Sequence, residues 1–280
     1  CIRYAHPAGR LTVVTTLRFV PTAAISKGTT MPTRKNILIT GASSGLGEGM
    51  ARLFAAMGRN LALCARRMDR LETLKAELEE KHPGITVLIK PLDVNDYDQV
   101  FAVFDAFRTE LAGIDRIIIN AGMGKGQPLG TGYFYANRQT AETNFVAALA
   151  QTEAAMEIFR AQNSGHLVMI SSISAMRGMK KNLTTYAATK AGVAMLAEGL
   201  QVELQNSPIK VTTIFPGFIR SEINEKVKNT PFLVDTETGC KALVKAIEKE
   251  PKNASVPGWP WGPLGFAMRN LPLKMVGKMM

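Results

Sequence analysis

The chain has 280 residues, of which 46% are hydrophobic, 20% charged and 7% aromatic. This composition is typical of a globular protein with a large apolar core, and it excludes a disordered, collagen-like or coiled-coil chain. Every long apolar run is broken by a charge or a proline, so a conventional membrane-spanning helix is not expected.

The formal net charge of +11 is concentrated at the two ends of the chain. Residues 1–30 and 251–280 contain basic side chains and no acid, whereas residues 31–250 are only mildly basic. A body of this kind suits a small anionic ligand, and it has no basic patch interleaved with aromatics. We therefore expect no nucleic-acid partner.

The cysteines and histidines indicate neither a metal site nor a disulfide framework. Cys1, Cys64 and Cys240 are far apart and belong to no CxxC motif, which fits a reducing cytoplasm. No histidine stands near another histidine or an acid at ligand spacing, so we interpret His166 as a solvated or strand-edge residue.

Residues 1–30 are rich in threonine and arginine. Such a segment is either a targeting peptide or an upstream extension that does not belong to the native product. We favour the extension, because Met31 opens a short polar stretch directly before the first predicted strand.

From residue 36 onward, short apolar runs alternate with longer segments of helical periodicity. The predicted strands are Asn36–Thr40, Leu61–Ala65, Thr86–Lys90, Arg116–Asn120, His166–Ser171 and Lys210–Phe215. The predicted helices are Ser44–Met57, Asp96–Leu111, Arg138–Arg160, Thr184–Gln205 and Thr238–Lys249. A further helix is predicted to begin with a capping box at Asp69 and Glu72 and to end before Pro83. This alternation predicts an α/β fold with one doubly wound (Rossmann) parallel sheet of about seven strands in residues 31–250, followed by a tail over 251–280.

A glycine-rich turn, Thr40–Gly47, connects the first strand to the first helix. Its glycines let the backbone turn sharply and let a phosphate approach the N–H groups at the helix N-terminus. The candidate cofactor-binding residues in this turn are Gly41, Ser43, Ser44, Gly45, Leu46 and Gly47. The spacing is G-x-x-x-G-x-G, which leaves open a tight turn that binds no ligand.

Arg66 and Arg67 follow the second predicted strand, where a dinucleotide fold meets the adenosine ribose. An acid at this place would bind a free 2′-hydroxyl, whereas a guanidinium suits a 2′-phosphate. The sequence therefore favours NADP(H) over NAD(H). The alternative is that both arginines are solvated charges before the next helix.

Tyr186 and Lys190 are four residues apart on a predicted helix, so their side chains lie on one face. A neighbouring ammonium favours the phenolate and lowers the pKa of the tyrosine toward the range needed for proton transfer. A hydroxyl from Ser172, at the end of the preceding strand, could polarise a carbonyl beside the phenol. Taken alone, Tyr186 is equally compatible with a half-buried packing residue.

Together these residues resemble the classical short-chain dehydrogenase/reductase family, over about residues 34–250. The motifs that carry the resemblance are the glycine turn at 40–47, Asp93-Val94, Asn120-Ala121-Gly122, Asn144, Ser172, Tyr186 with Lys190, and Pro216-Gly217. The resemblance implies that Asp93 and Val94 border the adenine of a bound dinucleotide. It further implies that Asn120, with Ala121 and Gly122, closes the cofactor site, and that the stretch from Pro216 through Gly217 and Ile219 to Ser221 lies against the nicotinamide.

The resemblance also implies a catalytic tetrad. Tyr186 would be the general acid in reduction, and Lys190 would hold ribose hydroxyls and lower the phenol pKa. Ser172 would orient the carbonyl, and Asn144 would anchor a water that relays protons. The interval from Ser172 to Tyr186 is one residue longer than the commonest one in the family, so either the loop over 176–183 absorbs it or Ser171 acts instead.

Two segments bear on the substrate and on partners. Residues 218–238 fall where the family places its substrate loop, and their apolar side chains predict an apolar pocket. The tail over 257–280 mixes Trp, Phe, Leu and Met with bases, a composition that suits the surface of an anionic bilayer. The alternative is a tail that packs on the body or on a partner subunit.

We therefore expect an NADP(H)-dependent oxidoreductase that reduces a ketone or aldehyde of a lipophilic substrate, such as a 3-oxoacyl chain. An alcohol, steroid or sugar dehydrogenase of the same family and a non-catalytic NADP(H) sensor stay open. The resemblance implies a homodimer or homotetramer. We expect the protein in the cytoplasm, with membrane contact if the tail binds lipid.

Overall fold

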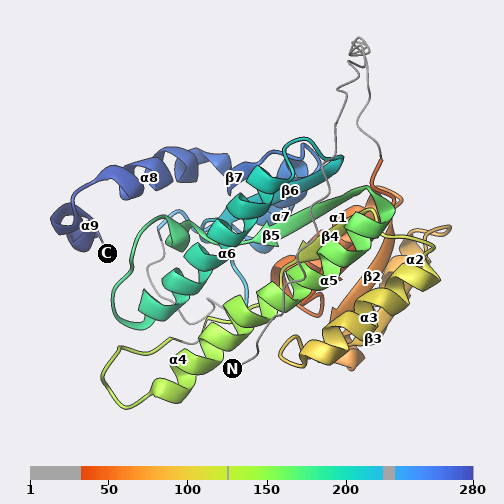
Figure 1. The fold of residues 1–280 in the computed structure, drawn as a ribbon, viewed down its shortest axis with the longest axis horizontal. Coiled ribbons are helices and arrows are strands. Elements are labelled where there is room, and N and C mark those ends of the chain that lie inside the picture. The colour runs from red at the N-terminus through yellow and green to blue at the C-terminus, as the bar shows by residue number, and fades with distance from the viewer. Residues whose placement is uncertain (1–32, 125, 223–230, 280) are drawn as a thin grey trace, which may run out of the picture. The chain divides into compact units, whose positions relative to one another are not determined.

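The computed structural model in Figure 1 describes residues 33–124, 126–222 and 231–279, and the chain from Arg34 onward forms one compact unit. The expectation for residues 1–30 lies outside the described residues, as does the part of the predicted substrate loop over 223–230.

The described residues form a seven-stranded parallel sheet with the strand order β3-β2-β1-β4-β5-β6-β7. The strands are β1 (Asn36–Thr40), β2 (Asn60–Ala65), β3 (Val87–Pro91), β4 (Arg116–Ile119), β5 (Gly165–Ile170), β6 (Ile209–Pro216) and β7 (Asn253–Val256). The predicted fold class is confirmed. The order changes direction between β1 and β4, and open α/β sheets bind ligands at this point, beyond the carboxyl ends of the strands.

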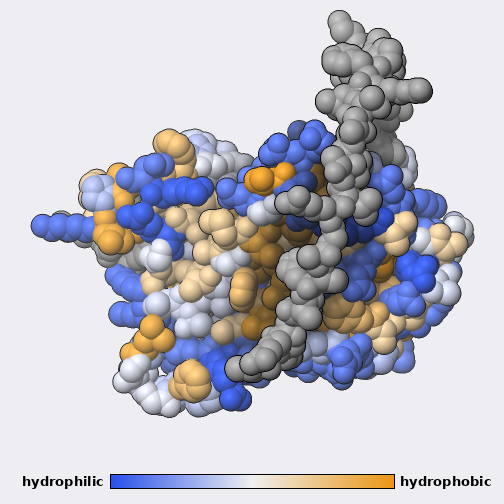
Figure 2. All heavy atoms as spheres, viewed as in Figure 1, coloured by the Kyte–Doolittle hydropathy of each residue, from blue (hydrophilic) through white to orange (hydrophobic). Residues whose placement is uncertain are grey.

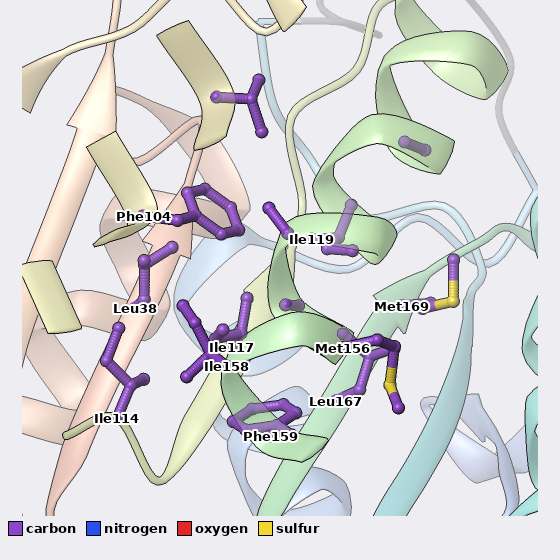
Figure 3. Packing of buried hydrophobic residues seen from close by; sticks show 14 of the residues in the cluster. Leu38, Phe104, Ile114, Ile117, Ile119, Met156, Ile158, Phe159, Leu167 and Met169 are labelled. Atoms are coloured by element: carbon purple, nitrogen blue, oxygen red, sulfur yellow. The ribbon is translucent and has the colours of Figure 1, made fainter. Parts of the chain in front are cut away.

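Helices cover both faces of the sheet. One layer contains α3 (Tyr97–Glu110), α5 (Ala147–Gln162) and α6 (Thr184–Glu203), and the other contains α1 (Gly45–Ala56), α2 (Met68–Lys81) and α7 (Thr236–Ile247). Successive strand residues point to opposite faces, so Leu38 of β1 joins the first layer while Ile37 and Ile39 join the second. Figure 3 shows the first layer, in which Phe104 of α3 and Phe159 of α5 belong to the same apolar cluster as Leu38. Burial on both faces explains why the strands are continuous apolar runs.

The remaining elements lie at the ends of these layers. They are α4 (Phe134–Ala141), the π-helix η1 (Glu142–Val146), the 3-10 turns η2 (Ile173–Met176) and η3 (Lys181–Leu183), α8 (Gly258–Asn270) and α9 (Leu273–Met279). Among the described residues, no helix has both the length and the apolar character needed to cross a bilayer.

The helix predicted over Arg138–Arg160 is interrupted by η1 in the structure. Asn144 lies within η1, and its side-chain amide donates to the carbonyl oxygen of Met123 and accepts from the N–H of the same residue, both at 2.8 Å. A wider turn of this kind re-aims a side chain without ending the helix. Helical periodicity continues on both sides, so the sequence pattern could not reveal the interruption.

The capping box predicted at Asp69 is wrong. Helix α2 begins at Met68, and its N-cap residue Arg67 makes no side-chain cap bond. Asp69 lies in the first turn instead, where its carboxylate still faces the positive end of the helix dipole.

The last strand, β7, lies beyond residues 31–250, in the segment that the sequence treated as a tail. Its residues are mostly half-buried or exposed, so no apolar run in the sequence predicts this strand. Helix α8 follows and ends at Asn270, and Leu271, directly before Pro272, has the extended conformation that the residue before a proline prefers. Trp261 and Met268 of α8 are buried in a cluster with Ile173, so the tail packs on the body.

Candidate active site

The glycine-rich turn leaves the carboxyl end of β1 and enters α1. Gly41 and Gly45 have φ angles of +65° and +56°, which favour glycine. A Cβ on Gly47 would lie 2.4 Å from the carbonyl oxygen of Gly41, so glycine is needed for α1 to begin this close to the turn. The N-cap residue Ser44 makes no side-chain cap bond, which leaves the first N–H groups of α1 to an anion. Leu46, next to Gly47, packs its side chain against the core of the second layer. The turn therefore fits the pyrophosphate of a dinucleotide.

Asn120 connects the end of β4 to this turn. Its Nδ2 donates to the carbonyl oxygens of Thr40 at 3.0 Å and Gly41 at 3.3 Å. The Thr40 hydroxyl accepts from the backbone N–H groups of Asn120 and Ala121 at 3.1 and 3.2 Å. Sequence reasoning did not select Thr40, although its place as the last strand residue before the turn was a usable signal.

The two arginines after β2 have different surroundings. Arg67 donates from Nη2 to the Ser44 hydroxyl at 2.6 Å and from Nε to the Ser43 hydroxyl at 3.3 Å, so its guanidinium lies at the glycine turn. Arg66 is exposed. The Glu222 carboxylate also pairs with Arg67, at 3.1 Å, so a 2′-phosphate that binds Arg67 must compete with it. No sequence motif marks Glu222.

Asp93 and Val94 follow β3 at the carboxyl edge of the sheet. Asp93 accepts from the backbone N–H and from the side-chain amide of Asn95, both at 3.0 Å. Val94 is buried. This loop therefore lies at the carboxyl end of β3, which neighbours β2 in the sheet, and its contact with an adenine stays a prediction.

The stretch after β6 runs from the sheet to the glycine turn. Pro216 ends β6, and the Gly217 N–H donates to a carbonyl oxygen of β7 at 2.8 Å. Ile219 is buried. A Cβ on Gly45 would lie 3.4 Å from the Cβ of Ser221, so the far end of this stretch lies beside the glycine turn.

The Ser172 hydroxyl lies close enough to the Tyr186 phenol to lower the pKa of that phenol. Ser172 also accepts from the N–H of Ser174 at 3.1 Å, as the N-cap of η2. The Ser171 hydroxyl donates instead to the backbone carbonyl of Lys190 at 2.7 Å. The structure therefore brings Ser172, and not Ser171, to the phenol, and the loop that contains η2 and η3 absorbs the additional residue.

Burial dominates the titration of the tyrosine and the lysine. Burial raises the pKa of Tyr186, and the nearby Ser172 hydroxyl offsets this in part. Burial lowers the pKa of Lys190 to about 8. The expected lowering of the phenol pKa by Lys190 is not found, because desolvation disfavours both charged forms here. The sequence pattern contained the pair but not its burial.

Asn144 and Lys190 come together beside Gly122. A Cβ on Gly122 would lie 3.2 Å from Asn144 Oδ1 and 3.4 Å from Lys190 Nζ. The Lys190 ammonium donates to the carbonyl oxygen of Ile170 at 2.9 Å, at the end of β5. The Asn144 amide is bonded to the backbone of Met123, so its part in holding a water stays a prediction.

Cys64 and Cys240 are buried free thiols. In the described ranges, no group of three or more His, Cys, Asp or Glu side chains is arranged to hold a metal ion.

A parallel sheet with a glycine-rich anion site and a Ser–Tyr–Lys cluster at its carboxyl edge defines a dinucleotide-dependent oxidoreductase. The short chain dehydrogenase family profile matches residues 35–231. An uncharacterised oxidoreductase of Mycobacterium tuberculosis is 54% identical over 243 residues, which are 87% of this chain and 96% of that protein. The chain belongs to the short-chain dehydrogenase/reductase family.

Two solved structures resemble the fold closely. Levodione reductase is 27% identical with a TM-score of 0.72, over 80% of this chain and 95% of that one. The NADPH-dependent 3-quinuclidinone reductase of Rhodotorula rubra is 25% identical with a TM-score of 0.70, over 77% of this chain and 84% of that one. The protein is thus an oxidoreductase of a family that uses a nicotinamide dinucleotide.

Proposed function

We propose that this protein is an NADP(H)-dependent reductase that converts the ketone or aldehyde of a lipophilic substrate, such as a 3-oxoacyl chain, into an alcohol. The observation that carries the proposal is the cluster of Ser172, Tyr186 and Lys190 at the carboxyl edge of the sheet, next to the glycine turn. A protein that only binds a dinucleotide has no need of this cluster.

The described residues fit a dinucleotide that would supply the hydride. The turn from Gly41 to Gly47 would hold the pyrophosphate, and Asp93 and Val94 would border the adenine. Asn120, Ala121 and Gly122 would line the middle of the site, and Pro216–Ser221 would lie against the nicotinamide.

The preference for NADP(H) rests on charge. Arg67 lies at the Ser43 and Ser44 hydroxyls, and Arg66 is its exposed neighbour. Both guanidinium groups would bind a 2′-phosphate, and neither of these two positions carries an acid to bind a free 2′-hydroxyl. The 3-quinuclidinone reductase, which is described as NADPH-dependent, is consistent with this preference.

Tyr186 is suited to donate a proton rather than to take one. Its raised pKa keeps the phenol protonated at neutral pH, so it can protonate the carbonyl oxygen as the carbon is reduced. Ser172 would orient that oxygen through its hydroxyl. The Lys190 ammonium would stabilise the phenolate that remains until solvent returns its proton, by way of a water that Asn144 anchors.

The lipophilic substrate is supported by the apolar side chains beside Ser172. Ile173 follows it directly and packs with Met176, Met179 and Phe218 in one cluster with Trp261. Methionine side chains adapt to irregular apolar shapes, which suits a flexible chain.

We also propose a homodimer or homotetramer in the cytoplasm. Five apolar side chains of η1, α5 and α6 are exposed, namely Phe145, Val146, Leu149, Met195 and Val202. They would be covered by the same face of a second copy. The buried free thiols Cys64 and Cys240 are compatible with a reducing compartment.

The experiment is NADPH oxidation by the purified chain with a series of 3-oxoacyl thioesters of increasing length. Turnover should rise with chain length, and Tyr186→Phe should retain NADPH binding but lose turnover by about a thousandfold or more. Light scattering on the same samples gives the oligomeric state. NADPH binding without turnover of any carbonyl in the series would contradict the lipophilic substrate.

A further inference from the structure

We infer that the protein docks on anionic lipid bilayers through one surface, here called the basic aromatic rim, which consists of residues 129–135, 180–183 and 266–275. The docking requires none of the catalytic residues, so it stands or falls independently of the proposed reaction.

The first segment of the rim is exposed along its whole length. Residues 129–135 form the end of the connection between β4 and α4 and include the first two residues of α4. Leu129, Phe134 and Tyr135 are 65%, 73% and 67% exposed. The rings of Tyr133 and Tyr135 lie 6.2 Å apart, so these two exposed rings are neighbours on the surface. Clusters of this kind on a protein surface mark binding sites.

The third segment presents the outer side of the C-terminal helices. The inner side of α8 is buried, because Trp261 and Met268 pack on the body. Phe266 and Leu273 point outward with 74% and 69% of their surface exposed. Arg269, also exposed, lies between them in sequence. The tail therefore packs on the body with one side and leaves an apolar and basic side free.

The middle segment joins the other two. A Cβ on Gly126 would lie 1.8 Å from the carbonyl oxygen of Asn182, so the loop before α4 contacts η3 directly. Arg177 donates to the carbonyl oxygens of Arg269 and Leu271, both at 3.2 Å, so the loop before η3 contacts the junction of α8 and α9. In Figure 1 α4, α8 and α9 lie toward the same end of the unit, and in Figure 2 apolar and hydrophilic side chains alternate there.

The charge of these segments indicates which kind of partner binds the basic aromatic rim. Residues 123–141, 171–185 and 257–279 contain no acid, whereas the rim includes Lys180, Lys181, Arg269 and Lys274. Cations beside aromatic and aliphatic side chains match an interface of anionic headgroups and acyl chains. A second copy would bring the same cations against one another across a two-fold axis, which is unfavourable. Nucleic acid would use stacking aromatics but not the aliphatic Leu129 and Leu273.

The rim lies next to the catalytic cluster. Residues 180–183 directly precede α6, which carries Tyr186, and η2 begins immediately after Ser172. If the proposed function holds, docking brings the catalytic edge of the sheet to the membrane, where a lipophilic carbonyl is dissolved. This consequence rests on the proposed function, and the docking itself does not.

The test is co-sedimentation of the full chain with vesicles of phosphatidylcholine alone or with added phosphatidylglycerol. The chain should bind the anionic vesicles and not the neutral ones. Phe134→Ser with Tyr135→Ser, Phe266→Ser with Leu273→Ser, and Arg269→Glu with Lys274→Glu should each lower the partition coefficient about tenfold or more. Tyr186→Phe should bind as the unchanged chain does, which separates docking from catalysis.

Two controls lie away from the rim. Lys245→Glu with Lys249→Glu, in and just after the last turn of α7, changes the net charge by the same amount and should leave binding unchanged. Met57→Ser removes another exposed apolar side chain, at the end of α1, and should also have no effect. Equal binding to neutral vesicles, unchanged binding of the rim variants, or an equal loss in the controls would each overturn the proposal. The proposal would also be overturned if a rim variant formed a smaller oligomer and bound the vesicles as the unchanged chain does.

Discussion

The Ser171 hydroxyl donates a hydrogen bond of 2.7 Å to the backbone carbonyl of Lys190, whereas the Ser172 hydroxyl lies beside the Tyr186 phenol and lowers its pKa. The two adjacent serines therefore have separable roles. Ser172→Ala is expected to lower kcat about 10²- to 10³-fold, because it removes a donor aimed at the carbonyl oxygen. Ser171→Ala should cost about 1 kcal/mol of stability and change kcat less than about tenfold. Steady-state kinetics and urea unfolding of both variants check this, and a larger kinetic loss in Ser171→Ala would reverse the assignment.

Lys190 is predicted to be retained for catalysis at the expense of stability. Burial lowers its pKa to about 8, from 10.5 in the unfolded chain, so folding disfavours its charged form. This penalty is fully present below pH 8 and is relieved as the pH rises from about 8 to 10.5. Lys190→Met should therefore stabilise the protein by about 2 kcal/mol at pH 7, less than the full shift because Ile170 loses its donor.

The measurement for Lys190→Met is the free energy of unfolding at pH 7 and at pH 10, alongside the unchanged chain. The gain in stability should shrink at the higher pH, and NADPH oxidation should be lost at both. A gain that does not depend on pH would show that packing, and not the buried charge, causes it.

Replacing Arg66 and Arg67 together by serine is expected to change the choice of cofactor. The KM for NADPH should rise about 10- to 100-fold, because charge-assisted bonds to the 2′-phosphate are lost, while the KM for NADH changes little. Arg70→Ser is the control, since Arg70 pairs with Glu222 from the next turn, whereas the bonds to the Ser43 and Ser44 hydroxyls come from Arg67. Equal increases for both cofactors would mean that the arginines support the fold rather than the phosphate.

Gly217 and Trp261 are predicted to depend on each other. A Cβ on Gly217 would lie 2.1 Å from Nε1 of the indole, and Phe218 packs edge-on against the same ring with centroids 5.3 Å apart. Gly217→Ala should cost about 2 kcal/mol in the unchanged chain and clearly less in a Trp261→Ala background, where the space is open. A double-mutant cycle by urea unfolding measures the coupling, and additive costs would show that the contact is not responsible.

The features of the fold that follow from local patterns were predictable. Apolar runs between helical segments gave the parallel sheet, and the glycine turn needed only its own residues. Features that depend on burial or on distant partners were not. The sequence predicts a solvated or strand-edge His166, yet this residue is fully buried on β5, where its Nδ1 accepts from Arg116 at 2.8 Å. Burial and the nearby Arg116 charge lower its pKa well below the usual range.

The candidate site shows the same division. The residue types of Tyr186, Lys190 and Ser172 indicate the chemistry of the site. Their order along the chain indicates the family. The choice between Ser171 and Ser172, the pairing of Arg67 with Glu222 and the direction of the Tyr186 pKa required three-dimensional distances and burial. Each depends on residues that are distant in sequence or on solvent exclusion, which no motif encodes.

Hydride transfer to a carbonyl carbon, coupled to protonation by Tyr186, is the step that defines the proposed reaction. The most direct measurement is a reaction of NADPH deuterated at the transferable position with a long-chain 3-oxoacyl thioester, followed by mass spectrometry of the product. We expect a hydroxyl product with one deuterium on the carbinol carbon, and no product above background with Tyr186→Phe. Deuterated NADPH that is bound but not consumed, or equal product from Tyr186→Phe, would contradict it.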